Sequence, residues 1–338
     1  MSSESESVRP VGWRQAWLVS PGPQSWRDAG VLMLKGAAMG TADVVPGVSG
    51  GTVAFITGIY DQLLCAIASF DLNALGRLLR GKLTETLAGL HLRFLLALGF
   101  GIAGAILSTA RLMHDLLTIH PVPTWSLFCG LIVASILVVG REIMDWWGGL
   151  PMLVLGVVSA HGIVGLIPVQ TPDTPSIVFL CGMVAICAMI LPGLSGAFLL
   201  LILGKYATIT GALRNPFDEG NLLLLAVFAS GCLVGLLGFS RILNLCLARF
   251  RNLTMALLTG LMIGAMRKVW PWKEVLETEL IRGKEYVLRE VNVFPEMGGR
   301  LLLALGLAAV GFVLVLVLDW WSRREGTSTR ACGALHKR

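Results

Sequence analysis

The chain is dominated by apolar stretches long enough to approach or reach the thickness of a lipid bilayer. Ten such segments occur, at residues 29–45, 47–69, 93–113, 123–140, 150–168, 176–190, 193–213, 221–247, 252–266 and 301–321. A helix needs about 20 apolar residues to cross the hydrocarbon core, and continuous runs exclude the alternating pattern of a membrane β-barrel. Only 14% of the residues are charged, against about 25% in soluble domains, which argues against soluble and nucleic-acid-binding classes. The sequence therefore predicts an all-α polytopic membrane protein.

The second organising feature is an internal repeat. The pentapeptide PGVSG at 46–50 recurs 146 residues later as PGLSG at 192–196. The same offset pairs Gly36 with Gly182, Gly58 with Gly204 and Tyr60 with Tyr206, and an offset of 130 then pairs Arg111 with Arg241, Thr124 with Thr254 and Gly130 with Gly260. Two ordered series of this kind predict a tandem duplication of about five helical segments each.

An odd number of segments per copy inverts the second copy in the membrane. In each copy a Pro-Gly pair separates the first two segments, which predicts a Pro-Gly-broken re-entrant hairpin. Inverted repeats with interrupted helices in matching positions are typical of secondary transporters, whose binding site lies where the repeats meet near the membrane midplane. We therefore expect two inverted-topology repeats that alternately expose one shared site.

The distribution of Lys and Arg favours cytoplasmic N- and C-termini, because basic residues concentrate in cytoplasmic loops. The predicted parts are a polar cytoplasmic tail at 1–28, a first transmembrane repeat at 29–168, a second at 176–321 and a basic cytoplasmic tail at 322–338. Within the second repeat, residues 267–300 form a predicted extracytoplasmic or interfacial insertion, in which the hydrophobic residues follow no clear helix or strand period.

The Pro-Gly motifs predict an anion site. Proline interrupts the helix and glycine lets the backbone approach a ligand closely, while a helix restarting after the break exposes free N–H groups and its positive dipole end. Basic side chains at the segment ends would complete such a site. The predicted substrate-binding residues are Ser49, Gly50, Gly51, Thr52, Ser195, Gly196, Lys35, Lys205, Arg111 and Arg241. The alternatives are a helix-packing motif for the glycines and snorkelling for the basic residues.

Asp43 lies within an apolar run, where a carboxylate costs about 2.5–3.5 kcal/mol on insertion scales. It is a candidate for accepting a coupling proton, for binding a coupling cation, or for capping the broken helix. The residue at the matching position of the second copy is Met189. The two halves therefore differ chemically at this position.

Other functional classes have weaker support. Residues 47–51 match the G-x-S-x-G pattern of serine hydrolases, but that elbow follows a strand, and an activated serine needs a histidine within reach. An intramembrane serine hydrolase using Ser49 stays as one alternative, and a small-anion or solute transporter as another. No nucleotide, metal or cofactor motif is recognised, so we expect no metal and no cofactor.

At these motifs the sequence resembles the bacterial polyprenyl-phosphate transporters. The resemblance rests on GTADVVPGVSGGT at 40–52, LPGLSGAF at 191–198, GKY at 204–206 and WPW at 270–272, and it extends over about residues 30 to 320. It implies a plasma-membrane flippase that returns undecaprenyl phosphate from the outer to the inner leaflet for reuse in envelope synthesis. The implied partners are polyprenyl phosphate, membrane lipid and a coupling proton or cation, and no nucleic acid.

Overall fold

Each of the ten predicted apolar segments forms a helix or a bent pair of helices in the computed structural model, which describes residues 12–45, 48–166, 171–281, 284–295 and 298–324. The first half contains α1 (Trp13–Val19), α2 (Trp26–Val44), α3 (Gly50–Ile56), α4 (Tyr60–Ala68), α5 (Leu72–Leu79), α6 (Leu83–Gly89), α7 (Leu92–Ile119), α8 (Pro121–Gly140) and α9 (Trp146–Val164). The second half contains α10 (Pro175–Ile190), α11 (Gly196–Ile202), α12 (Tyr206–Arg214), α13 (Asn221–Arg249), α14 (Arg251–Val269), β1 (Lys273–Ile281), β2 (Lys284–Asn292) and α15 (Gly299–Arg324).

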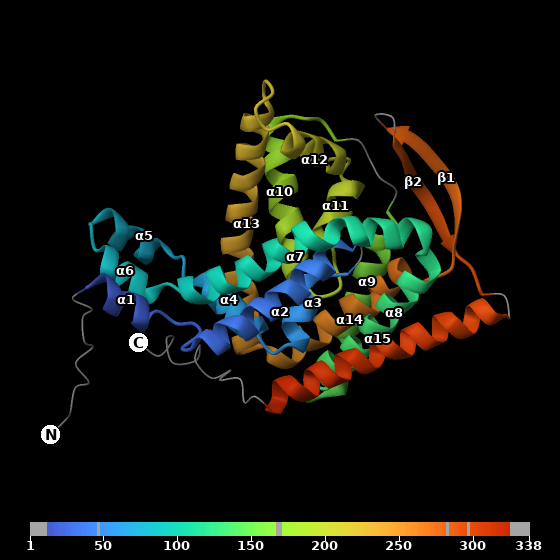
Figure 1. The fold of residues 1–338 in the computed structure, drawn as a ribbon, viewed down its shortest axis with the longest axis horizontal. Helices are drawn as coiled ribbons and strands as arrows, with labels where there is room; N and C mark the ends of the chain where they lie inside the picture. Colours follow the sequence, from blue (N-terminus) through green and yellow to red (C-terminus); the bar gives the residue numbers. More distant parts are fainter. Residues whose placement is uncertain (1–11, 46–47, 167–170, 282–283, 296–297, 325–338) are drawn as a thin grey trace.

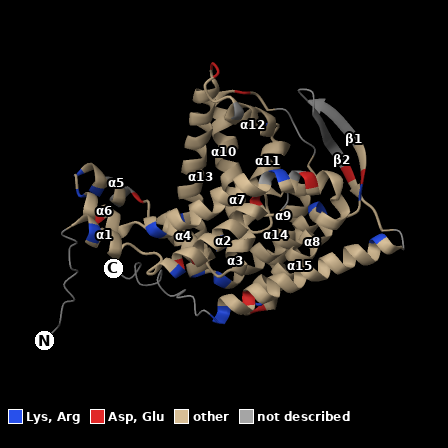
Figure 2. Ribbon diagram, viewed as in Figure 1, with Lys and Arg blue, Asp and Glu red and all other residues tan. Residues whose placement is uncertain are grey.

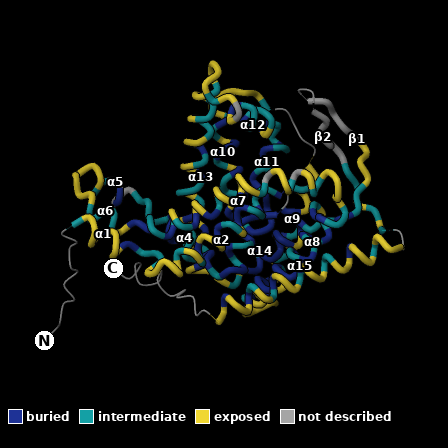
Figure 3. The backbone as a smooth tube through the Cα atoms, in the orientation of Figure 1, coloured by how far each residue is buried: buried dark blue, intermediate teal, exposed yellow. Residues whose placement is uncertain are grey.

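The apolar helices confirm an all-α polytopic membrane protein. Among the described residues, five helices are long and apolar enough to cross a membrane, and counting each bent pair as one span raises this number to seven. Leucine and valine side chains cover the outer faces of α13 and α15, as expected for surfaces in contact with lipid. Buried residues instead gather where α2, α3, α8 and α14 meet (Figure 3).

Each apolar segment that follows a Pro-Gly pair contains a further bend, which lies at a glycine. Helices α3 and α4 meet at 118°, and α11 and α12 meet at 116°. Gly58 (φ +70°) and Gly204 (φ +68°) adopt the left-handed conformation at these bends, and the following amides bond back to Ala54 and Leu200. This is the bond pattern of a Schellman cap, which explains why both copies need glycine here. Pro46 and Gly47 themselves lie outside the described residues.

Helix contacts follow the same order in both halves. In the first half α2 packs on α7, and in the second α10 packs on α13 (Figure 1). Gly36 lies close against the backbone of Leu98, and Gly182 lies close against that of Phe228, so the paired glycines allow tight helix packing. The later helices cross between the halves, because α8 packs on α15 and α9 packs on α14. The inverted orientation of the two copies and the predicted part boundaries stay predictions.

The segments between the spans carry further structure. Residues 267–300 contain an antiparallel hairpin of β1 and β2, which the all-α description did not include. This hairpin lies at the opposite end of the molecule from α1, α5 and α6 (Figure 1). Lys, Arg, Asp and Glu are sparse along the long helices and gather near their ends (Figure 2).

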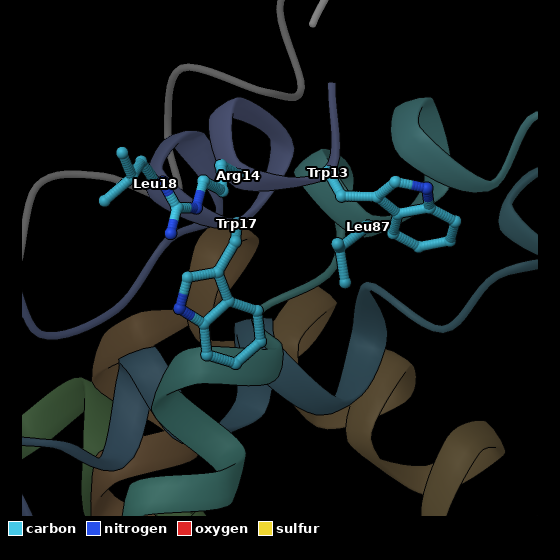
Figure 4. A pocket seen from close by; sticks show the side chains of 5 residues that line it. All are labelled: Trp13, Arg14, Trp17, Leu18 and Leu87. Carbon is cyan, nitrogen blue, oxygen red and sulfur yellow. The ribbon is translucent and has the colours of Figure 1, made fainter. Parts of the chain in front are cut away.

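Helix α1 falls inside the predicted polar tail, and α2 already begins at Trp26. Together α1 and α6 border a pocket of about 560 Å³, lined by Trp13, Arg14, Trp17, Leu18 and Leu87 (Figure 4). Its lining is almost wholly apolar, and tryptophans of this kind favour the membrane–water interface. Arg14 is the one charged side chain among the described residues of this lining, and it is not among the predicted site residues.

Candidate functional site

The two Pro-Gly regions meet in the structure, although they are more than 100 residues apart in sequence. The Ser49 hydroxyl lies 3.2 and 3.1 Å from the carbonyl oxygens of Met189 and Leu191 and can donate to either. In return, the Gly193 amide donates to the Thr52 hydroxyl oxygen at 3.1 Å. Ser49 and Thr52 are both buried. The start of α3 is therefore fixed directly to the loop that leads into α11.

Asp43 caps the N-terminus of α3. One of its carboxylate oxygens accepts a hydrogen bond of 2.7 Å from the Gly50 amide, and the Ser49 hydroxyl accepts one of 3.1 Å from the Gly51 amide. The next two amides, those of Thr52 and Val53, bond to the Ser49 carbonyl. The expectation of free amides at this helix is therefore wrong for this structure, because a carboxylate and a hydroxyl of the chain already occupy them. This is the capping role considered above for Asp43.

In the described chain, the N-terminus of α11 lacks the side-chain capping bonds found at α3. Ser195 is its N-cap residue, but its side chain makes no capping hydrogen bond. The amides of Gly196, Ala197 and Phe198 have no hydrogen-bond partner within the described part of the chain. A Cβ added to Gly196 would lie 2.5 Å from the Ala185 carbonyl oxygen and 3.0 Å from Met189 Cγ, so Met189 is the nearest side chain. Asp43 faces Gly50 in the same way, so the two halves differ in having a carboxylate or a thioether at equivalent places.

The two predicted lysines lie at the far ends of the broken helices. The Lys35 ammonium donates to the Thr57 carbonyl at 3.0 Å, at the C-terminal end of α3. Lys205 follows α11 and bonds to the carbonyl of Thr171 and the carboxylate of Asp173. Both ammonium groups are buried, and that of Lys35 complements the negative end of the α3 dipole. The structure therefore places neither lysine beside Ser49 or Ser195.

The paired arginines also lie away from the two loops. Arg241 on α13 donates to the Phe70 carbonyl, at 2.7 Å, just after α4. Arg111 on α7 is exposed and has no polar partner among the residues that the structure describes. The structure thus gathers Asp43, Ser49, Gly50, Gly51 and Thr52 against residues 189–196 and leaves the four predicted basic residues outside this group.

Sequence reasoning missed an ionic cluster between α14 and the β-hairpin. The ammonium groups of Lys268 and Lys273 each lie 2.8 Å from the same carboxylate oxygen of Glu290. Burial pushes the pKa of Glu290 up, but the two ammonium charges outweigh it and hold that pKa below its usual value. Burial, together with the charge of Lys268, lowers the pKa of Lys273. The two lysines flanking the WPW sequence at 270–272 were the available signal.

The chemistry that these residues offer is hydrogen bonding to an anion. All polar partners of the Ser49 hydroxyl in the described chain are backbone atoms, which gives no support to an activated nucleophile. A search of the described residues found no group of three His, Cys, Asp or Glu side chains that could hold a metal ion. The open amides and hydroxyl at the start of α11, by contrast, can all donate to an anion.

Comparisons with known proteins identify the family. The profile of an undecaprenyl phosphate translocase-like family matches residues 39–286. The chain is 42% identical over 304 residues to a polyprenyl-phosphate transporter of Vibrio cholerae, covering 86% of this chain and 96% of that protein. It is 31% identical over 256 residues to a polyprenyl-phosphate transporter of Staphylococcus aureus, covering 71% and 86% respectively. No solved structure matches significantly. The chain belongs to the undecaprenyl phosphate translocase-like family.

Proposed function

We propose that this protein carries undecaprenyl phosphate from the outer to the inner leaflet of the bacterial plasma membrane, so that the lipid carrier can be reused. The observation that carries the proposal is the contact between the two Pro-Gly regions, where Thr52 binds the Gly193 amide next to α11 amides that have no partner among the described residues. The named activity of the two relatives supports the substrate class.

The physical problem in this reaction is the phosphate. A bare phosphate is strongly disfavoured in the roughly 30 Å of hydrocarbon that it must cross. Donors fixed inside the protein replace the lost water, and the isoprenoid tail stays in lipid. The Gly196, Ala197 and Phe198 amides with the Ser195 hydroxyl form the phosphate-binding group in this proposal. Ser49, Gly50, Gly51 and Thr52 act as its partner across the interface between the halves.

Movement of the inverted halves would expose this group to each leaflet in turn. Because α8 packs on α15 and α9 packs on α14, each moving unit in this proposal contains helices from both halves of the sequence. Lys35, Lys205, Arg111 and Arg241 stay candidates for binding the phosphate in other states of the cycle. The distribution of basic residues supports cytoplasmic termini.

Asp43 is the proposed coupling residue. It is an acid in a membrane-embedded helix, and its carboxylate holds the Gly50 amide only while it can accept a hydrogen bond there. Binding a proton or cation at Asp43 would change that bond and so the packing of α3. Coupling therefore acts through the same contact that joins the two halves.

The test is reconstitution of the purified protein into liposomes that contain labelled polyprenyl phosphate. Leaflet exchange is scored with and without a pH gradient, and we expect it to exceed that of protein-free liposomes. A Ser108→Ala variant is a matched control, because the hydroxyl of Ser108 bonds only within α7. Exchange no faster than in protein-free liposomes would refute the proposal.

The same assay separates the alternatives. A small-anion transporter would move inorganic phosphate into the liposomes and would not exchange polyprenyl phosphate between the leaflets. A serine hydrolase would release inorganic phosphate or another cleavage product and would lose all activity in Ser49→Ala. The proposed transporter keeps part of its activity in that variant, because backbone donors persist.

A further inference from the structure

The ionic cluster at the start of the β-hairpin lies against both halves of the protein. Lys268 lies in the last turn of α14. The next residue, Val269, is buried in one cluster with Val45 and Val48 of the first Pro-Gly region. The Lys268 ammonium also lies 4.8 Å from the ring centre of Phe198, the third residue of α11. The cluster is therefore adjacent to the two loops that form the proposed phosphate site.

Aromatic rings hold the second ammonium as well. Lys273 lies 5.0 Å from the ring centre of Trp125 on α8 and donates to the Lys268 carbonyl at 2.6 Å. The Lys268 and Lys273 side chains are only 19% and 11% exposed. Partly desolvated ammonium groups over aromatic faces interact more strongly with an anion than exposed lysines do.

The charges in this cluster do not balance. Two ammonium groups share one oxygen of a single carboxylate, Glu290 Oε1, so the cluster has one excess positive charge. Because both nitrogens lie 2.8 Å from that atom, they are separated by no more than twice that distance. A phosphate group presents several oxygens across such a gap and carries more negative charge than a carboxylate, so it matches this pair of donors better.

We infer that Lys268 and Lys273 form a docking site for a phosphate monoester headgroup, in which Glu290 occupies the ammonium groups until the phosphate replaces it. This site precedes the membrane-embedded one, and the inference rests on the proposed function. From here the headgroup passes along the Phe198 side of α11 to the amides at the start of that helix. The recognised chemistry is the phosphate monoester, whether it belongs to the lipid or to a soluble phosphate.

Three variants and one control test the site by direct binding. Purified protein in nanodiscs is titrated with polyprenyl phosphate, and its thermal stability is recorded alongside. The double variant Lys268→Gln/Lys273→Gln should bind about tenfold more weakly, and the Lys268→Arg/Lys273→Arg variant should restore affinity to within about twofold. The Lys82→Gln variant is the control, because Lys82 also pairs with one glutamate, Glu85, but lies on the surface away from this cluster.

The decisive variant is Glu290→Gln. If Glu290 competes with the phosphate, its removal tightens binding about threefold or more. If the cluster is only a structural ion pair, Glu290→Gln and the double glutamine variant both lower thermal stability, and neither tightens binding. Unchanged affinity in the double variant, or weaker binding in Glu290→Gln, would overturn the docking site.

A second arm separates the sources of the phosphate. Inorganic phosphate is added as a competitor, and we expect it to displace the lipid from the wild type but to have a much smaller effect on the double glutamine variant. Equal competition in both proteins would overturn the inference. Failure of the wild type to exchange polyprenyl phosphate between leaflets would instead refute the proposed function, so the two failures are distinguishable.

Discussion

The two broken helices α3 and α11 have the same length and nearly the same bend, yet their first turns are chemically different. In α3 the amides are bonded by Asp43 and by Ser49, whereas in α11 the N-cap side chain makes no such bond. The two elements thus share their geometry, whereas only α3 has its first amides bonded by a carboxylate of the chain. The contrast supports our proposal, in which α3 fixes the interface between the halves and α11 binds the ligand.

The strongest way to break this comparison is to give α11 the carboxylate that α3 has. In Met189→Asp the new carboxylate faces Gly196 as Asp43 faces Gly50, and it would compete for the α11 amides at high effective concentration. We expect polyprenyl phosphate affinity to fall about 100-fold, measured by binding in nanodiscs. Met189→Asn is the matched control and should bind far better than the aspartate variant. Equal affinity in the two variants would contradict the assignment of α11.

Removing the carboxylate from the first copy tests the opposite role. Asp43→Ala leaves the Gly50 amide unsatisfied and should lower the free energy of unfolding by about 1–3 kcal/mol, measured by thermal or denaturant unfolding in detergent. Asp43→Asn keeps an acceptor for that amide and should lose much less stability.

The asparagine variant also isolates the coupling role of Asp43. It cannot take up a proton, so its leaflet exchange should no longer respond to a pH gradient across the liposome membrane. An undiminished response to the gradient would leave Asp43 with a purely structural role.

The two N-cap serines should show a crossed pattern of effects. Ser49→Ala removes a hydroxyl that bonds across the halves, so we expect it to cost about 1 kcal/mol of stability. Ser195→Ala removes a hydroxyl with no capping bond, so its stability should change by less than about 0.5 kcal/mol. Its affinity for polyprenyl phosphate should nevertheless fall about fivefold. If both variants lose stability equally, the proposed division of roles is wrong.

Much of this arrangement could be predicted from sequence, because it depends on local signals. The Pro-Gly motifs and the pairing of Gly58 with Gly204 indicated two matching elements at 47–69 and 193–213. The bend at Gly58 or Gly204 inside each of these elements was not predicted. The bonding of the α3 amides could not be predicted, since Asp43 was equally compatible with capping, proton uptake and cation binding. Lys35 and Lys205 reach the far ends of the broken helices because of how α2 and the 171–173 loop pack. Packing of this kind leaves no periodic pattern in the sequence.

The smallest effect expected concerns the β-hairpin, whose contacts with α14 include the ion pair of Lys268 with Glu290. Because the pKa of Glu290 is held below its usual value, its ionised form stabilises hairpin attachment above about pH 4.5, and this contribution is lost as the pH falls through the lowered value. Lys273 has the opposite balance, since its lowered pKa means that its charge costs stability at neutral pH and is relieved only in alkaline solution. We expect hydrogen exchange of the hairpin amides at 273–276 and 290–292, corrected for intrinsic rates, to rise in acid by an amount equivalent to less than about 1 kcal/mol. In Glu290→Gln, hydrogen exchange of the hairpin amides should not depend on pH in that range. In the wild type, exchange at the contact between α3 and the loop leading into α11 should not follow this titration, because neither Glu290 nor Lys273 lies there.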